Sequence, residues 1–162
     1  MKQELQVAVL MGSESDWEVM KSTAETLQQF GISHEARVLS AHRTPAETAR
    51  YVRKREAAGT QVFIAAAGMA AHLAGTVAAN TTRPVLGVPL TGSSLHGLDA
   101  LLATVQMPAG VPVGTLAIGQ AGAINAALLA VSILALQRPP LRQKLSAVRK
   151  KQARKILAAK LV

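Results

Sequence analysis

The sequence predicts an α/β protein: a three-layer, doubly wound parallel sheet, Rossmann or flavodoxin-like, with a C-terminal helix. Two observations support this fold class. Short apolar runs of strand length alternate with longer segments of helical periodicity, which favours a parallel sheet covered by helices. Several of these runs break directly into small polar residues, as strands do at the ligand-binding edge of such a sheet. We assign residues 1–137 to one α/β domain and residues 138–162 to a basic helix that packs on the same assembly.

The first strand is predicted at Gln6–Met11, a continuous apolar run typical of a strand that is covered on both faces. Ser15 and Asp16 can cap the helix that follows, and the helical pattern continues to about Phe30. Gly31 then ends this helix, because glycine readily adopts the left-handed conformation found at helix ends.

The second strand is predicted at Ile32–Leu39. The helix after it has Pro45 in its first turn, where a missing N–H leaves no helical hydrogen bond unmade. This helix ends near Gly59, and the rest of the domain repeats the alternation of strands and helices. In chain order we predict a strand at Val62–Ala66, a loop and short helix that end before Arg83, a strand at Val85–Val88, a turn-rich loop at Thr91–Gly97, a helix at Leu98–Val105, a proline-containing loop at Gln106–Pro112, a strand at Gly114–Ile118 and an apolar helix at Ala121–Leu136.

The net charge of +9 comes entirely from the C-terminal segment. Residues 1–137 contain equal numbers of basic and acidic side chains, whereas residues 138–162 contain nine Lys or Arg and no acid. Apolar residues recur in this segment at helical intervals, which predicts a basic amphipathic helix, separated from the apolar helix by Pro139 and Pro140. Such a helix either packs on its own subunit or a neighbour, or binds a polyanion. The lack of interleaved aromatic residues favours packing, so we expect no nucleic-acid and no membrane partner.

The apolar helix at Ala121–Leu136 predicts an assembly of several subunits. It is about 16 residues long and contains Asn125 and Ser132, so it falls short of the roughly 20 apolar residues that span a bilayer. A helix that is apolar on nearly every side is buried, and in a domain of this size that favours burial between subunits. With no recognisable secretion signal, we expect a cytoplasmic homo-oligomer.

The first candidate site segment is Gly12–Asp16, which joins the first strand to its helix. Its amides and the hydroxyls of Ser13 and Ser15 can bind a phosphate at the positive end of the helix, or they can simply cap it. Asp16 would repel a phosphate, so it better suits sugar hydroxyls. The segment lacks the lysine of a Walker A loop and is not a G-x-G-x-x-G motif.

Two histidines follow the ends of the next two strands. His42 can transfer a proton near neutral pH, and Arg43 beside it can hold a phosphate or carboxylate, although an exposed His–Arg pair often has no function. His72 either approaches the same pocket or is a buried structural histidine. Gly68 and the amides of residues 69–71 can stabilise a small anion.

Several classes of chemistry are excluded by what the sequence lacks. There is no cysteine, which excludes thiol nucleophiles and Cys-based metal sites. No histidine and carboxylate show a familiar metal-ligand spacing, and no G-x-S-x-G motif offers a serine nucleophile. The class of chemistry that remains is proton transfer on a substrate that is positioned by charged groups, and we expect no metal and no cofactor.

Five motifs, between about residue 6 and residue 136, resemble those of the N5-carboxyaminoimidazole ribonucleotide mutases. They are MGSESD at 11–16, SAHRTP at 40–45, AGMAAHLAG at 67–75, PVLGVPL at 84–90 and QMPAGVPVGTLAIG at 106–119. The resemblance implies a homo-octamer with active sites at subunit junctions, and an isomerase of de novo purine (IMP) biosynthesis that needs no ATP, metal or organic cofactor. Ala74, where the family often has proline, is a departure that touches no proposed catalytic group.

The resemblance also implies the reaction, in which a phosphorylated ribonucleotide, N5-carboxyaminoimidazole ribonucleotide, becomes 4-carboxy-5-aminoimidazole ribonucleotide. His42 is then the general acid and base: carbon dioxide leaves N5, stays trapped and joins C4, and His42 removes the C4 proton. We expect substrate to be bound by residues of the loops after the first three strands. They are Ser13, Ser15, Asp16, Ser40, Arg43, Gly68, Met69, Ala70, His72 and Leu73.

Two other functions stay open. A related branch carboxylates aminoimidazole ribonucleotide directly with carbon dioxide; it tends to have lysine in place of Arg43 and lacks the AAHL run that ends here at Leu73, so both features favour the mutase. A non-catalytic nucleotide-binding or RNA-binding scaffold would depend on the basic helix, and its affinity would fall steeply with salt.

Overall fold

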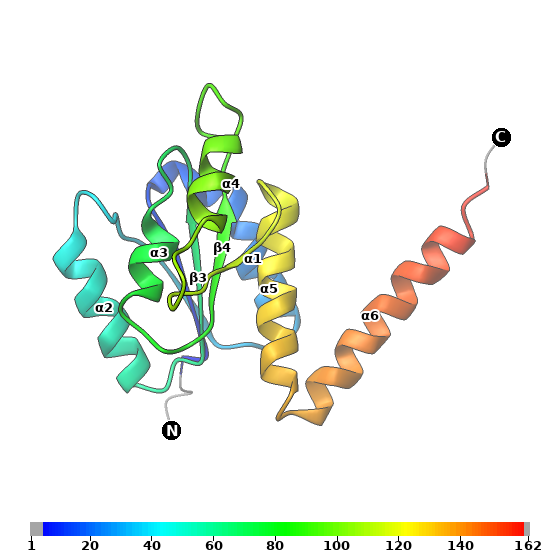
Figure 1. Ribbon diagram of the computed structural model, residues 1–162. Helices are drawn as coiled ribbons and strands as arrows, with labels where there is room; N and C mark the ends of the chain where they lie inside the picture. Colours follow the sequence, from blue (N-terminus) through cyan, green and yellow to red (C-terminus); the bar gives the residue numbers. More distant parts are fainter. Residues whose placement is uncertain (1–4, 161–162) are drawn as a thin grey trace.

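The computed structural model describes residues 5–160 and contains a five-stranded sheet in which every pair of neighbouring strands is parallel (Figure 1). The strand order is β2-β1-β3-β4-β5. The strands are β1 (Val7–Met11), β2 (His34–Val38), β3 (Val62–Ala67), β4 (Val85–Pro89) and β5 (Gly114–Thr115). Because this order places β1 between β2 and β3, the loops that follow these three strands lie next to one another at one edge of the sheet.

Helices cover both faces of the sheet, which confirms the predicted three-layer fold. They are α1 (Trp17–Gln29), α2 (Pro45–Ala57), α3 (Leu73–Ala78), α4 (Leu98–Val105), α5 (Gln120–Ala135) and α6 (Pro139–Leu157), and a 3-10 turn at Glu14–Asp16 precedes α1. The α1 and α5 helices pack on each other over one face, and α2 and α3 cover the other. The α4 helix joins the α3 side, since Thr104 and Ala74 both approach Gly87 of β4.

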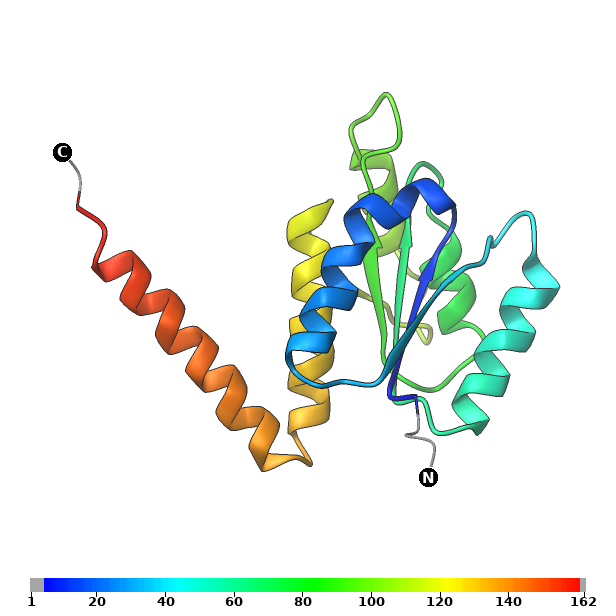
Figure 2. The same cartoon turned by 180° about the vertical axis from the view of Figure 1, so that it is seen from behind.

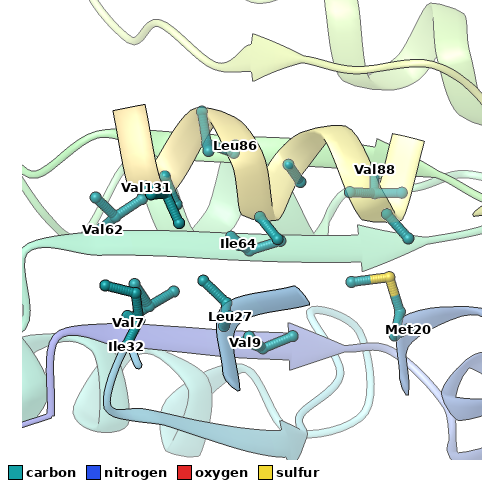
Figure 3. Close-up of a cluster of buried hydrophobic side chains, with 14 of the residues drawn as sticks. Val7, Val9, Met20, Leu27, Ile32, Val62, Ile64, Leu86, Val88 and Val131 are labelled. Carbon is teal, nitrogen blue, oxygen red and sulfur yellow. The ribbon is translucent and has the colours of Figure 1, made fainter. Parts of the chain in front are cut away.

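The main core lies between the sheet and the layer formed by α1 and α5 (Figure 3). Ile64 of β3 and Val88 of β4 point into it, and Met20 and Leu27 of α1 meet them there. On the opposite face, a second buried cluster surrounds Phe63 of β3. Alternate residues of each central strand therefore face opposite helical layers, which explains why these strands are continuous apolar runs.

The α6 helix extends away from the rest of the molecule (Figures 1 and 2). Leu141 is buried, and Leu145 and Val148 lie against the core that contains α5. Every described residue beyond Val148 is exposed, including Ile156 and Leu157 at 75% and 85%. The predicted basic helix is thus present, although it ends at Leu157, and residues 161–162 lie outside the described part of the chain.

The predicted fifth strand is wrong in length. It was expected at Gly114–Ile118, but only Gly114 and Thr115 pair with β4. Leu116 still donates a hydrogen bond to the Gly87 carbonyl (2.9 Å), after which the chain turns toward the start of α5. The Gly119 amide still donates to the Pro89 carbonyl at the end of β4 (2.9 Å), and Ala117 lies directly against Gly122 in the first turn of α5. The segment therefore stays beside β4 without the regular pairing of a strand.

Other element bounds differ less. The second strand is His34–Val38 rather than Ile32–Leu39, and the first helix begins with the separate 3-10 turn. Gly31 has a φ of 73°, as its predicted role at a helix end requires. Between residues 5 and 160, no helix combines the length and apolar character needed to cross a membrane.

Candidate active site

A cavity of about 550 Å³ lies at the carboxyl ends of β1, β2 and β3. It is the place at which an open parallel sheet binds its ligands, because loops and helix N-termini meet there. All eleven residues predicted for the site line this cavity, and no predicted site residue lies elsewhere. The lining residues are Gly12, Ser13, Ser15, Asp16, Ser40, Ala41, His42, Arg43, Ala67, Gly68, Met69, Ala70, Ala71, His72, Leu73 and Gly92.

The loop after β1 brings hydroxyls and one carboxylate to the cavity. The Ser13 amide donates a hydrogen bond to Asp16 Oδ2 (2.9 Å), and the Ser15 hydroxyl donates to Ser13 Oγ (3.0 Å). Burial raises the pKa of Asp16 above its usual value; the amide hydrogen bonds from Ser13 and Gly12 and the charge of Arg43 lower it by less. The environment of Asp16 therefore disfavours its charged form, and hydroxyl donors from a ligand would stabilise it.

The loop after β2 is a closed turn that holds itself in place. The Ser40 amide donates to Thr44 Oγ1 (2.9 Å), and the Thr44 amide donates to the Ser40 carbonyl (3.0 Å). The Ser40 hydroxyl in turn accepts the Arg43 amide (3.1 Å). These bonds leave the side chains of His42 and Arg43 exposed at the mouth of the cavity.

Arg43 links the first two loops. Its Nη2 donates a hydrogen bond to the Gly12 carbonyl (3.0 Å), 31 residues earlier in the chain. A guanidinium carries five N–H donors, so this contact orients the group and leaves donors for an anion in the cavity. The predicted use of Arg43 as an anion ligand is compatible with this position.

The loop after β3 has an unusual backbone. Met69 and Ala71 have φ values of 56° and 37°, which residues other than glycine rarely adopt. The Ala71 amide donates to the Gly68 carbonyl (3.0 Å), and Leu73 is buried in the core beneath the loop. Backbone strain of this kind persists only where the surroundings fix it, and it concentrates at functional sites.

His42 and His72 meet in this cavity. The Nε2 atom of His42 and the Nδ1 atom of His72 are 2.7 Å apart, within hydrogen-bond distance. The ring centroids are 4.8 Å apart and the planes cross at 77°, so the rings meet edge-on rather than stacked. The expected approach of His72 to the pocket is confirmed, and the alternative of a buried structural histidine is wrong because His72 is exposed.

The sequence analysis did not assign Gly92, which also lines the cavity, to the site. It follows β4, and its backbone lies close to Gly68. The turn-rich run Thr91–Gly97 at the end of a predicted strand was the signal that could have placed it. Among the described residues, no three histidines or carboxylates are gathered as a metal ion would require.

Known proteins similar to this chain share its length and its fold. The AIR carboxylase family profile matches residues 6–155. The N5-carboxyaminoimidazole ribonucleotide mutase of Brucella melitensis is 53% identical over 150 residues, covering 93% of each chain. The protein of the same name from Vibrio cholerae is 52% identical over 151 residues, covering 93% of this chain and 94% of the relative. The crystal structure of Treponema denticola PurE matches with a TM-score of 0.86 at 28% identity and covers 94% of each chain.

Proposed function

We infer that this chain, which belongs to the AIR carboxylase family, is an N5-carboxyaminoimidazole ribonucleotide mutase, an isomerase of purine biosynthesis. In the reaction the bond from N5 to the carboxyl carbon breaks and a bond from C4 to that carbon forms. A proton leaves C4 and a proton is added at N5. Atoms and charge balance within one substrate molecule. The protein must therefore transfer protons and hold the carboxyl group while it moves from N5 to C4.

We propose that His42 is the general acid and base. Its ring is exposed to the cavity, on a turn whose backbone is fixed by hydrogen bonds between Ser40 and Thr44. Carbon dioxide leaves N5, stays in the pocket and joins C4, after which His42 removes the C4 proton and restores the aromatic ring. The Gly68 loop, with the amides of Met69 and Ala70, holds the carboxyl group while it moves.

The remaining lining residues bind the nucleotide. Arg43 supplies a charge-assisted contact to an anionic group of the substrate, and the hydroxyls of Ser13, Ser15 and Ser40, which line the same cavity, add polar contacts. Asp16 accepts hydrogen bonds from the ribose hydroxyls. Leu73, which is buried and lines the cavity, completes the set of residues that we assign to the site.

The single observation that carries this assignment is the meeting of three loops in one cavity, with an imidazole, a guanidinium and a carboxylate all facing it. The test is a spectrophotometric assay with freshly made N5-carboxyaminoimidazole ribonucleotide, without ATP, metal or bicarbonate. We expect rapid formation of the C4-carboxylated product. Turnover only from aminoimidazole ribonucleotide plus bicarbonate would identify a direct carboxylase instead, and no turnover of either substrate would favour a binding scaffold.

The role of His42 is tested by His42→Asn. We expect kcat to fall by about 10²-fold to 10⁴-fold with substrate binding retained. The matched control is His34→Asn, because His34 lies on β2, contacts the Ile32 carbonyl through Nδ1 (2.9 Å) and does not line the cavity. Unchanged turnover in His42→Asn would remove His42 from the mechanism.

We also propose that the protein acts as a cytoplasmic homo-octamer. Apolar side chains of α4, α5 and α6 are exposed on the single chain, among them Leu102, Leu129 and Leu157. Exposed apolar surface on several helices is typical of subunit interfaces. Light scattering of the purified protein tests this proposal, with the mass of eight chains as the expected result.

A further inference from the structure

We propose that a second cavity binds the phosphate group of a small molecule, with the guanidinium groups of Arg138 and Arg83 as its main ligands. This cavity has a volume of about 560 Å³ and shares no lining residue with the cavity that contains His42. Because the two cavities are separate, the proposal holds or fails independently of the proposed mutase function. We call the second cavity the arginine cavity.

The arginine cavity lies at the amino ends of two central strands, on the side of the turn between α5 and α6 (Figure 1). Gln61 directly precedes β3, and Arg83 and Pro84 directly precede β4, which pairs with β3 in parallel. Ile133 in the last turn of α5 forms another part of the wall. The candidate active site lies beyond the other end of β3, a strand of six residues, so the two cavities are about 20 Å apart. A small ligand in the arginine cavity therefore does not touch the substrate.

Arg138 brings a positive charge without a carboxylate partner to this cavity. It is half-buried, directly before α6, and its Nη2 donates a hydrogen bond to Gln61 Oε1 (3.3 Å). A guanidinium has five N–H donors, so this bond orients the group and leaves the other donors for a ligand. Between residues 5 and 160, no carboxylate forms an ion pair with Arg138. A charge that is partly removed from water is stabilised by a counter-charge, which a bound anion would supply here.

Arg83 adds a second guanidinium from a different segment of the wall. Its Nε lies 3.8 Å from Glu56 Oε1, an oxygen that also accepts the Thr82 hydroxyl (2.9 Å). Glu56 does not line the cavity and contacts Arg83 through Nε, so the Nη atoms of Arg83 remain available for a ligand. A phosphate group carries close to two negative charges and three strong acceptor oxygens, and it therefore suits two guanidiniums better than a carboxylate does.

The carboxyl end of α5 opposes an anion in this cavity, but only weakly. The last carbonyls of a helix together carry about half a negative charge. In α5 the amides of Leu136, Gln137 and Arg138 donate back to these carbonyls at 3.2–3.4 Å, which occupies them. Two full positive charges exceed what remains, so the potential in the cavity favours an anion.

The size of the arginine cavity allows two sources of the phosphate group. Its volume lies within the range of about 300–1,000 Å³ that holds small-molecule ligands. It accepts either free inorganic phosphate or the phosphate of a nucleotide. In the second case, Pro84 and Ile133 offer apolar contacts to the rest of the ligand, and the amide of Gln137 offers a polar contact.

Isothermal titration calorimetry of the full chain tests the proposal, with inorganic phosphate, adenosine monophosphate and adenosine as probes. We expect Arg138→Gln to weaken phosphate binding at the arginine cavity by at least about tenfold, and the double variant Arg83→Gln with Arg138→Gln to abolish it. The matched control is Arg142→Gln, one turn further along α6 and exposed, which does not line this cavity and should bind as wild type does. Phosphate binding at the candidate active site is common to all of these proteins, so the difference between them reports the arginine cavity.

The probes also distinguish the two sources. Tighter binding of adenosine monophosphate than of phosphate, lost in the double variant, would identify a nucleotide, and equal or weaker binding would identify free phosphate. Identical phosphate isotherms for wild type and the double variant would overturn the proposal. Binding of adenosine at this cavity as tight as that of adenosine monophosphate would overturn it as well, because the phosphate group would then contribute nothing.

A measurement on the wild-type protein covers the case in which the variants do not fold or assemble. Phenylglyoxal modifies accessible arginines, and mass spectrometry identifies each modified position. We expect phosphate to slow the modification of Arg138 and Arg83 and to leave that of Arg142 unchanged, relative to chloride at the same ionic strength. Equal modification of Arg138 in phosphate and in chloride would overturn the proposal, and so would equal slowing at Arg138 and Arg142.

Discussion

Asp16 illustrates how a site residue can oppose the stability of the protein that contains it. Burial raises its pKa in the folded state above the usual value of 3.8. A carboxyl group whose folded-state pKa is raised favours the folded state at low pH, and this contribution is lost as the pH rises through the raised folded-state value. At neutral pH, therefore, the ionised Asp16 weakens the fold.

The raised pKa of Asp16 gives a first prediction. Asp16→Asn should have a higher thermal midpoint than wild type at pH 7, and the difference should shrink as the pH falls to about 3, below the unfolded-state pKa of about 3.9, where the wild-type carboxyl is largely protonated in both states. Substrate affinity should fall in the same variant. Scanning calorimetry over this pH range is the measurement, with Glu18→Gln on the exposed side of α1 as control. A lower midpoint at pH 7 would show that the hydrogen bond from Ser13 outweighs the effect of burial.

Arg43 gives a second prediction. Lysine keeps the charge but cannot contact the Gly12 carbonyl and a substrate anion with one planar group. Arg43→Lys should raise KM by about tenfold, which corresponds to about 1.4 kcal/mol, and leave kcat nearly unchanged. Arg53→Lys is the matched control, since Arg53 binds Asn80 outside the cavity. Equal KM values in the two variants would contradict the assigned role.

For individual residues, the sequence predicted which side chains share the cavity, but it did not predict the hydrogen bonds between them. Polar residues at strand ends identified the loops, because strand ends of a parallel sheet converge. The bond between His42 and His72 depends on β1 lying between β2 and β3, and no local pattern near either histidine contains that information. The roles assigned to the site residues stay predictions.

The third prediction concerns how α5 and α3 begin. Gly122 and Gly75 are both the third residue of their helix, so alanine brings the same gain in helix propensity to each. A methyl group on Gly122 would lie 1.7 Å from the Ala117 carbonyl oxygen, whereas one on Gly75 would meet only the flexible end of Met107. Gly122→Ala should lower the free energy of unfolding by about 1–3 kcal/mol or more, and Gly75→Ala should not. Urea denaturation of both variants tests this, and equal stability would refute it.

The same contact explains why element bounds were harder to predict than element types. β-strands, helices and their order follow from apolar periodicity, as β1 and β3 show. Regular pairing of β5 stops at Thr115, where the chain begins to approach α5 and Ala117 comes to lie against Gly122, a contact that depends on tertiary structure. Short edge strands are therefore the elements whose length a sequence specifies least.

At the scale of the whole molecule, α6 is the helix that extends away from the rest of the protein. Its charge and periodicity predicted a basic helix, but its direction away from the body could not be predicted. Among its described side chains, Leu141, Leu145 and Val148 pack on the core, and Lys144 donates to the Phe30 carbonyl (3.3 Å). If the proposed octamer covers the far end of α6, replacing Ile156 and Leu157 together by glutamate should lower the mass measured by light scattering. Replacing Lys150 and Lys151 together by glutamine should leave it unchanged, because exposed charges contribute little to association. An unchanged mass in the first variant would exclude this end of α6 as an interface.

The position of β2 at the edge of the sheet has a consequence for heat inactivation. Among the described strands, β2 pairs only with β1, and its last two residues are exposed, yet it carries the loop that presents His42. Local opening of an edge strand requires less free energy than global unfolding. Warming should therefore separate His42 from His72 while the other strands remain paired, so that activity is lost reversibly a few degrees below the melting transition. Cooling from that interval should restore turnover without any refolding of the core.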